Sequence, residues 1–177
     1  MPIQPRLVVT GGAAEVLMDA SAEPVTVGAS PGVEFFLLWG TPDGTPSVGA
    51  KPAEPVTLPF FAGPGGTRLL LARYAPASSV PEPAGDPDAL RAEADALLPG
   101  LLDPFEPGDD SGMHSTDTLD YGICLEGELW LELDDGTEVR LTPGTCVVQQ
   151  GTRHAWHNRS DAPALMCFVG IGAVREG

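Results

Sequence analysis

Histidine and carboxylate side chains, the groups that most often bind metals or exchange protons, gather in residues 108–158. All three histidines of the 177-residue chain lie in this stretch. His114 and Asp120 fall near its start and His154 near its end, in fixed relation to several glycines. An imidazole from each end and a carboxylate indicate either a metal site or an acid–base site, provided that the fold brings them together.

Short strands joined by turns are predicted to carry these side chains. Residues 119–133 are rich in apolar and aromatic side chains and are followed by an Asp-Asp-Gly turn signal at 134–136. Further strands are predicted over 138–141 and 145–150, with a Thr-Pro-Gly turn at 142–144. Such a run of antiparallel strands is typical of a sandwich or a small barrel.

Strand geometry predicts which of these side chains share a face, because alternate residues of a strand point the same way. Two sets of three are each expected on one face: His114, Thr116 and Asp120, and His154, Trp156 and Asn158. Two distant strands would thus present an imidazole each, and one a carboxylate, to a common interior. Tyr121 and His157, which have the opposite parity, are expected to face away.

The first of these patterns resembles a motif of the cupin superfamily. That motif runs glycine, five residues, His, any residue, His, three or four residues, Glu, six residues, Gly. Gly108, His114, Asp120 and Gly127 stand at the corresponding places. The sequence departs from the motif at two of them, with Thr116 in place of the second His and Asp120 in place of Glu.

The end of the stretch resembles the second cupin motif, which closes with glycine, two residues, His, three residues, Asn. Gly151, His154 and Asn158 fit this spacing, whereas Gln149 replaces the usual proline and the loop from Gly144 is one residue shorter. The resemblance implies an all-β fold of the cupin type, a double-stranded β-helix or jelly-roll barrel, with extra N-terminal strands and one short helix. It also implies a possible homodimer, because leading strands in such proteins often swap between subunits.

His114, Asp120 and His154 together form a 2-His-1-carboxylate set, which suits Fe(II) and also accepts Mn, Ni, Co or Zn. Thr116 is a poor neutral ligand, so three good protein ligands are the most that the sequence offers. The alternative is a cupin without a metal, in which Asp120 or His154 acts as general acid or base, or in which the cavity only binds a molecule.

Four further residues are candidates for contact with a small-molecule ligand. Thr116 lies at a motif position, and Trp156 either packs in the barrel or stacks on a flat ligand. Gln149 and Gln150 differ in facing, and Gln149 is the candidate hydrogen-bonding group. Arg153 either attracts a carboxylate at the barrel mouth or is a solvated surface side chain.

The chain divides into three predicted regions within one structural domain. Residues 1–76 supply N-terminal strands that pack on the barrel, 77–107 form a linker and a short helix, and 108–177 form the barrel core. Asp86 is expected to cap the helix, with Leu90, Ala94, Leu97 and Leu98 on its apolar side and a stop at 99–100. This helix is either a lid over the barrel mouth or a packed element that closes the sheet edge.

Composition excludes some classes of partner. The formal net charge of −16 repels phosphate backbones and anionic membranes, so neither nucleic-acid nor membrane binding is expected. The sequence shows no secretory leader pattern and no apolar run of membrane-spanning length. Its three cysteines form no CxxC pair, which indicates reduced thiols and a cytoplasmic location.

The sequence therefore predicts a cupin-type protein that binds a small molecule, and it is compatible with three functions. The first is a metal-dependent tailoring or catabolic enzyme, such as a lyase, isomerase, cyclase or dioxygenase. The second is a metal-free enzyme that uses Asp120 or His154 for proton transfer. The third is a non-catalytic ligand-binding module.

Overall fold

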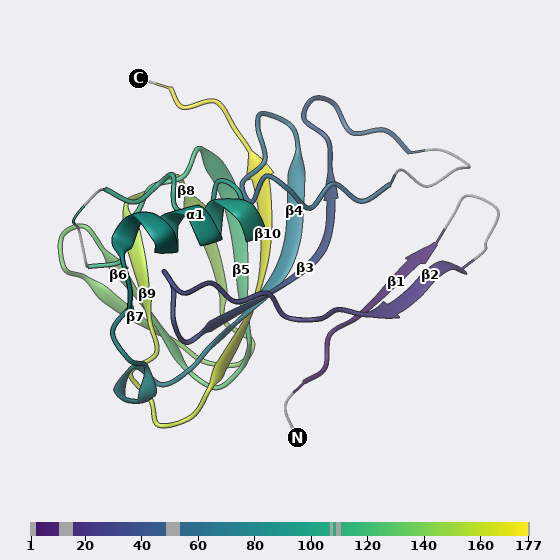
Figure 1. The fold of residues 1–177 in the computed structure, drawn as a ribbon. Helices are drawn as coiled ribbons and strands as arrows, with labels where there is room; N and C mark the ends of the chain where they lie inside the picture. The colour runs from purple at the N-terminus through teal and green to yellow at the C-terminus, as the bar shows by residue number, and fades with distance from the viewer. Residues whose placement is uncertain (1–2, 11–15, 49–53, 107, 109–110, 177) are drawn as a thin grey trace.

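The computed structural model of the chain describes residues 3–10, 16–48, 54–106, 108 and 111–176. Antiparallel strands dominate these residues, and one α-helix crosses in front of them (Figure 1). This arrangement confirms the predicted all-β class with one short helix. No helix in the described residues is both long enough and apolar enough to cross a membrane.

The larger sheet has five strands and forms one wall of the barrel. Its strands, in spatial order, are β3 (Val33–Thr41), β4 (Thr67–Tyr74), β10 (Ala164–Gly172), β5 (Thr118–Glu126) and β8 (Cys146–Gln150). Every neighbouring pair in this order is antiparallel. Two strands from the N-terminal half of the chain therefore belong to the same sheet as the strands that carry Asp120 and Gln149.

The smaller sheet has three strands and faces the larger one. Its spatial order is β7 (Glu138–Leu141), β6 (Leu129–Leu133) and β9 (His154–His157). The apolar run 119–133 is thus divided between the two sheets, with the corner at Gly127. This residue has a φ of 71°, and a Cβ there would lie 2.3 Å from the Pro163 carbonyl oxygen, so only glycine fits.

Apolar side chains on the inner faces form the core between the sheets. Cys124, Leu129, Leu141 and Met166 are fully buried where β5, β6, β7 and β10 face one another. Cys124 therefore acts as a small buried hydrophobic residue. The outer face of the large sheet buries a smaller cluster that includes Phe36, Leu71 and Leu165.

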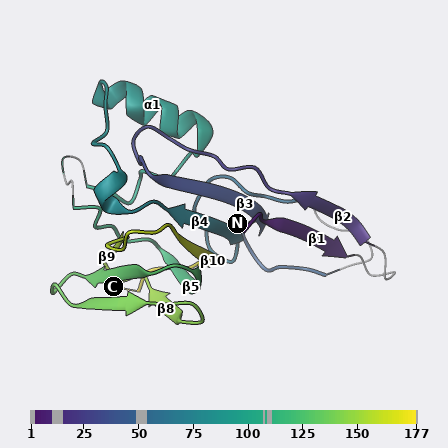
Figure 2. The ribbon, with the colours of Figure 1, turned by 90° about the horizontal axis from the view of Figure 1, so that it is seen from below.

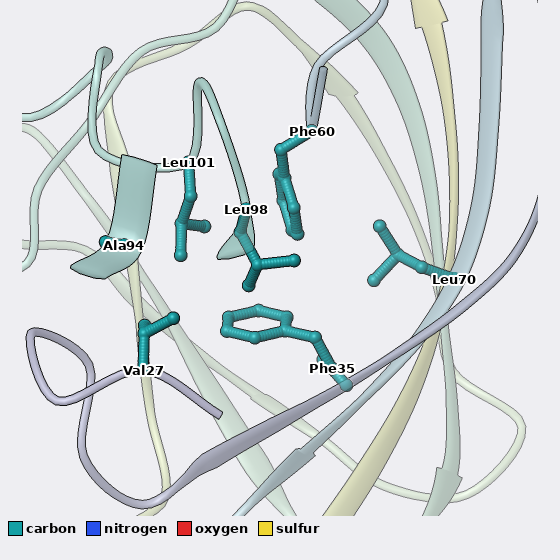
Figure 3. Packing of buried hydrophobic residues seen from close by; sticks show 8 residues of the cluster. Val27, Phe35, Phe60, Leu70, Ala94, Leu98 and Leu101 are labelled. Carbon is teal, nitrogen blue, oxygen red and sulfur yellow. The ribbon is translucent and has the colours of Figure 1, made fainter. Parts of the chain in front are cut away.

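Helix α1 (Pro87–Leu97) completes the core beside β3 and β4. Asp86 caps it by accepting a hydrogen bond from the Ala89 N–H at 3.0 Å, as predicted. Ala94 and Leu98 are 0% exposed and pack in the same cluster as Phe35 and Phe60 (Figure 3). The expectation for Leu97 was wrong, because its side chain is 45% exposed.

The first two strands, β1 (Arg6–Thr10) and β2 (Val16–Ser21), form a separate two-stranded sheet. This hairpin projects away from the barrel in both views (Figures 1 and 2). Its register pairs Val9 with Met18 and Leu7 with Ala20, which gives one face made of apolar side chains. Val8 pairs with Asp19 on the opposite face.

Candidate functional site

The two histidines predicted to act together are held side by side by the backbone. His114 and His154 exchange two N–H to carbonyl hydrogen bonds, each of 2.9 Å, and their ring centroids lie 4.4 Å apart. Each Nδ1 contacts the carbonyl oxygen two residues earlier, at 3.0 Å to Gly112 and 2.8 Å to Thr152. These contacts place the proton on Nδ1 and leave Nε2 of each ring as the nitrogen with a free lone pair.

Burial keeps both imidazoles neutral. His154 is only 4% exposed. Loss of hydration, reinforced by the neighbouring His114, lowers the pKa of His154 to about 4. Burial likewise lowers the pKa of His114 from its usual value. At neutral pH the pair therefore offers two uncharged nitrogen acceptors, or two ligand atoms, and no positive charge.

Aromatic rings extend this pair along the barrel interior. Phe105 stacks on His114 with centroids 4.6 Å apart, and Trp156 meets His154 edge-on at 5.2 Å. Trp156 in turn lies 5.4 Å from Phe168 and packs against the core cluster that contains Cys124 and Met166. Of the two roles predicted for Trp156, the structure places it in the packed interior, next to the imidazoles.

Asp120 lies at the end of a short chain of buried hydroxyl groups, from Thr118 on β5 and Thr116 just before it. The Thr118 hydroxyl donates to Asp120 Oδ2 at 2.6 Å and lies 2.7 Å from the Thr116 hydroxyl. Thr118 has a single hydroxyl proton, so while it donates to Asp120 its oxygen accepts from Thr116. Burial raises the pKa of Asp120, and the hydrogen bonds from the two threonines oppose that rise.

Asp120 faces a different residue on each of the two strands next to β5. On β10 the facing residue is Gly170, where a Cβ would lie only 3.0 Å from Asp120 Oδ1. On β8 the facing residue is Gln149, whose side chain is buried while that of Gln150 is exposed. Gln149 is thus the glutamine that points inward.

The candidate metal ligands fall into two groups in this structure. His114 and His154 contact each other, whereas Asp120 is bonded to threonine hydroxyls. Within the part of the chain that the structure describes, no three His, Cys, Asp or Glu side chains converge as a metal site would require. As arranged, these residues do not fit a three-ligand centre, and Thr116, at the place of a fourth ligand, is bonded to Thr118.

Other residues named from the sequence have partners of their own. Arg153 forms an ion pair with Asp134, with 2.6 Å between Nη1 and Oδ1. Asn158 donates to the carbonyl oxygens of Tyr74 and Ala162, so it ties β9 to the neighbouring chain segments. His157 lies on the other side of β9 from His154, with Nε2 2.9 Å from Glu132 Oε2.

Two parts of the site were not found from the sequence. Thr118 shares strand parity with Thr116 and Asp120, which is the signal that could have identified it. A pocket of about 330 Å³ opens beside Thr116. It is lined by Pro59, Phe61, Gly100, Asp103, Pro104, Ser115, Thr116 and Asp117. Pro59, Phe61 and Gly100 come from loops outside the motifs, and nothing in the sequence of these loops indicates a pocket.

Comparison with known proteins identifies the family. A family model described as a cupin domain matches residues 103–170. Oryzines biosynthesis cluster protein J of Aspergillus oryzae is 31% identical over 141 residues, which cover 73% of this chain and 76% of that protein. The chain belongs to the cupin superfamily, as the two motifs predicted.

Two other relatives match over a shorter length. Phomopsin biosynthesis cluster protein C' of Diaporthe leptostromiformis is 47% identical over 68 residues, 38% of this chain and 36% of that protein. Cupin-domain-containing oxidoreductase fogC of Aspergillus ruber is 38% identical over 78 residues, 42% of this chain and 38% of that protein. These matches span little more than a third of each relative, so they do not bear on the whole of either protein.

Proposed function

We propose that the protein is a tailoring enzyme that moves a proton on a small organic molecule held in the barrel. The observation that carries this proposal is the partly buried Asp120 carboxyl group, hydrogen-bonded by the buried Thr118 and placed beside the inward-facing Gln149. Partial burial raises the pKa of this carboxyl group, which favours its use as both acceptor and donor of a proton. The matches to proteins named for biosynthesis clusters support a role in tailoring.

The reaction class follows from what such a carboxyl group can do without a cofactor. The carboxylate takes a proton from a carbon next to a carbonyl group, and the C–H electron pair moves into the enolate. Return of the proton at another carbon gives an isomer. Delivery of the proton to a departing hydroxyl group gives an alkene and water. The threonine hydroxyls hold the carboxyl group in place, and the neutral imidazoles of His114 and His154 accept hydrogen bonds from the substrate.

A metal-dependent oxidoreductase is the second candidate, favoured by the name of the fogC protein and by the free Nε2 atoms of the histidine pair. In this case His114 and His154, with Asp120 after a change in its side-chain position, would hold a divalent ion such as Fe(II), Mn, Ni, Co or Zn. Such an ion would supply Lewis-acid or redox chemistry.

Metal content separates the two candidates. We expect elemental mass spectrometry of untagged wild-type protein to find well under one equivalent of transition metal, and turnover to persist after treatment with a chelator. His154→Ala should leave the metal content unchanged. About one equivalent of metal per chain in the wild type, lost in His154→Ala together with turnover, would replace the acid–base proposal by the metal-dependent one.

We also propose that the protein is a homodimer assembled through the β1–β2 hairpin. A two-stranded hairpin is marginally stable alone, and this one leaves the apolar face of Leu7, Val9, Met18 and Ala20 partly exposed away from the barrel. Light scattering should give the mass of two chains for the wild type and of one for Met18→Lys. Val8→Lys, on the opposite face, is the control and should stay dimeric. A monomeric wild type contradicts the proposal.

A further inference from the structure

The Gln149 side chain is a buried hydrogen-bond donor that the rest of the chain does not use. The residue is 5% exposed, and its Nε2 atom is buried without a hydrogen-bond partner among the described residues. Buried amide groups are nearly always hydrogen-bonded, because losing water without gaining a partner is unfavourable. A donor that none of the described residues pairs with points to an acceptor on a bound molecule.

The position of Gln149 brings this donor next to the proposed acid–base group. Gln149 on β8 faces Asp120 on β5, and facing residues of antiparallel strands have Cβ atoms roughly 5 Å apart. Asp120 Oδ2 is already bonded to Thr118 on the same strand. On the far side of Asp120, Gly170 contributes no side chain. The amide donor of Gln149 and the carboxyl group of Asp120 are thus neighbours on one face of the sheet, and Asp120 Oδ1 lies over Gly170.

The Gln149 amide and the Asp120 carboxyl group together limit the kind of group that can bind between them. An amide N–H needs an oxygen acceptor, and the adjacent carboxyl group disfavours a second negative charge close by. A neutral carbonyl oxygen meets both conditions. Carbons next to such a carbonyl group are also the ones from which a carboxylate can remove a proton.

We propose that Gln149 binds the carbonyl oxygen of the substrate, and that the substrate class is therefore neutral carbonyl compounds such as ketones, aldehydes and esters. This inference rests on the proposed function and specifies the ligand of the same site. The Gln149 N–H donates to the carbonyl oxygen and keeps donating as negative charge develops there. Gln149 is a binding residue, and Asp120 carries the proton.

Binding of a carbonyl probe to the whole chain tests the inference without requiring turnover. The probe is acetophenone, and its matched control is ethylbenzene, which has the same ring and carbon chain without the oxygen. Titration of ¹⁵N-labelled protein is expected to shift the side-chain NH₂ signals of Gln149 with acetophenone and not with ethylbenzene. Gln149→Met, of similar length, identifies these signals by their loss.

The affinity for acetophenone should fall about 5- to 10-fold in Gln149→Met, the effect of one lost hydrogen bond, while the affinity for ethylbenzene stays within about twofold. Gln149→Glu, which keeps the length and loses the NH₂ group, should weaken acetophenone binding similarly. Gln150→Met, on the exposed side of β8, should bind as the wild type does.

Three results would overturn the inference: no binding of acetophenone at millimolar concentration, equal binding by Gln149→Met, or no shift of the Gln149 signals in the wild type. The last observation needs no variant and so does not depend on whether Gln149→Met folds. A negative result in these binding experiments would not contradict proton transfer by Asp120, because that proposal is tested separately by turnover. A wild-type protein that binds the carbonyl probe but turns over no substrate would instead indicate a binding module.

Discussion

Asp120→Asn is expected to lower kcat by about 10²–10⁴-fold, the usual contribution of a general acid–base group. The amide has nearly the same shape as the carboxyl group and can still accept a hydrogen bond from Thr118, but it cannot exchange a proton. The measurement is kcat on the compound that accumulates in a strain lacking the gene. Asp161→Asn, at an exposed position, is the matched control and should leave kcat unchanged.

Two companion measurements make the result specific to proton transfer. Acetophenone should bind Asp120→Asn at least as tightly as the wild type, because the amide removes a negative charge from beside the carbonyl oxygen. Metal content should be the same in both proteins. If Asp120→Asn retained kcat within about threefold, Asp120 would not be the acid–base group and the proposed reaction would be wrong.

Leu98→Ala is expected to reduce the free energy of unfolding by about 2–5 kcal/mol, the range for removing a fully buried leucine side chain. Leu98 is 0% exposed and packs with Phe35 and Phe60, whose rings lie 5.2 Å apart (Figure 3). Truncation would leave a cavity among side chains from β3, α1 and the loop at residues 59–61. Urea denaturation followed by circular dichroism measures the change.

The neighbouring residue provides the control. Leu97 is 45% exposed, so Leu97→Ala should cost well under 1 kcal/mol. A large difference between the two variants means that α1 is a permanent wall of the core and not a lid that opens for each substrate. Equal, small effects would show instead that the helix can leave the core without unfolding the barrel.

Spacing and strand parity were sufficient to predict the fold and the facing of most site residues. The two motifs predicted the barrel, and parity predicted that Tyr121 points outward, where it is 41% exposed. Both kinds of inference work because strand geometry repeats every two residues whatever the rest of the chain does. Parity also predicted that Gln149 and Gln150 lie on opposite faces of their strand. The structure shows that Gln149 is the one that points inward.

The arrangement of groups within the site could not be predicted in the same way. Parity places Asp120 on the same face as His114, but the rotamer of Asp120 depends on the Thr118 hydroxyl and on the space over Gly170. The partner of Arg153 is Asp134, 19 positions earlier in the sequence, and it was found only through the fold. Leu97 and Leu98 are adjacent in sequence, and the exact angle at which α1 packs decides which one is buried.

The wall formed by α1 has a consequence for how this protein and its relatives diverge. The helix ends at Leu97, before the segment 103–170 that matches the family model. Ala94 and Leu98 hold this helix in the core, and Glu93 Oε2 accepts a hydrogen bond from the Gly28 N–H at 2.8 Å. The side chains that fix α1 therefore lie apart from the strands that carry Asp120, Gln149 and the histidine pair. Substitutions on the exposed side of α1 can thus alter this face of the molecule without displacing those strands.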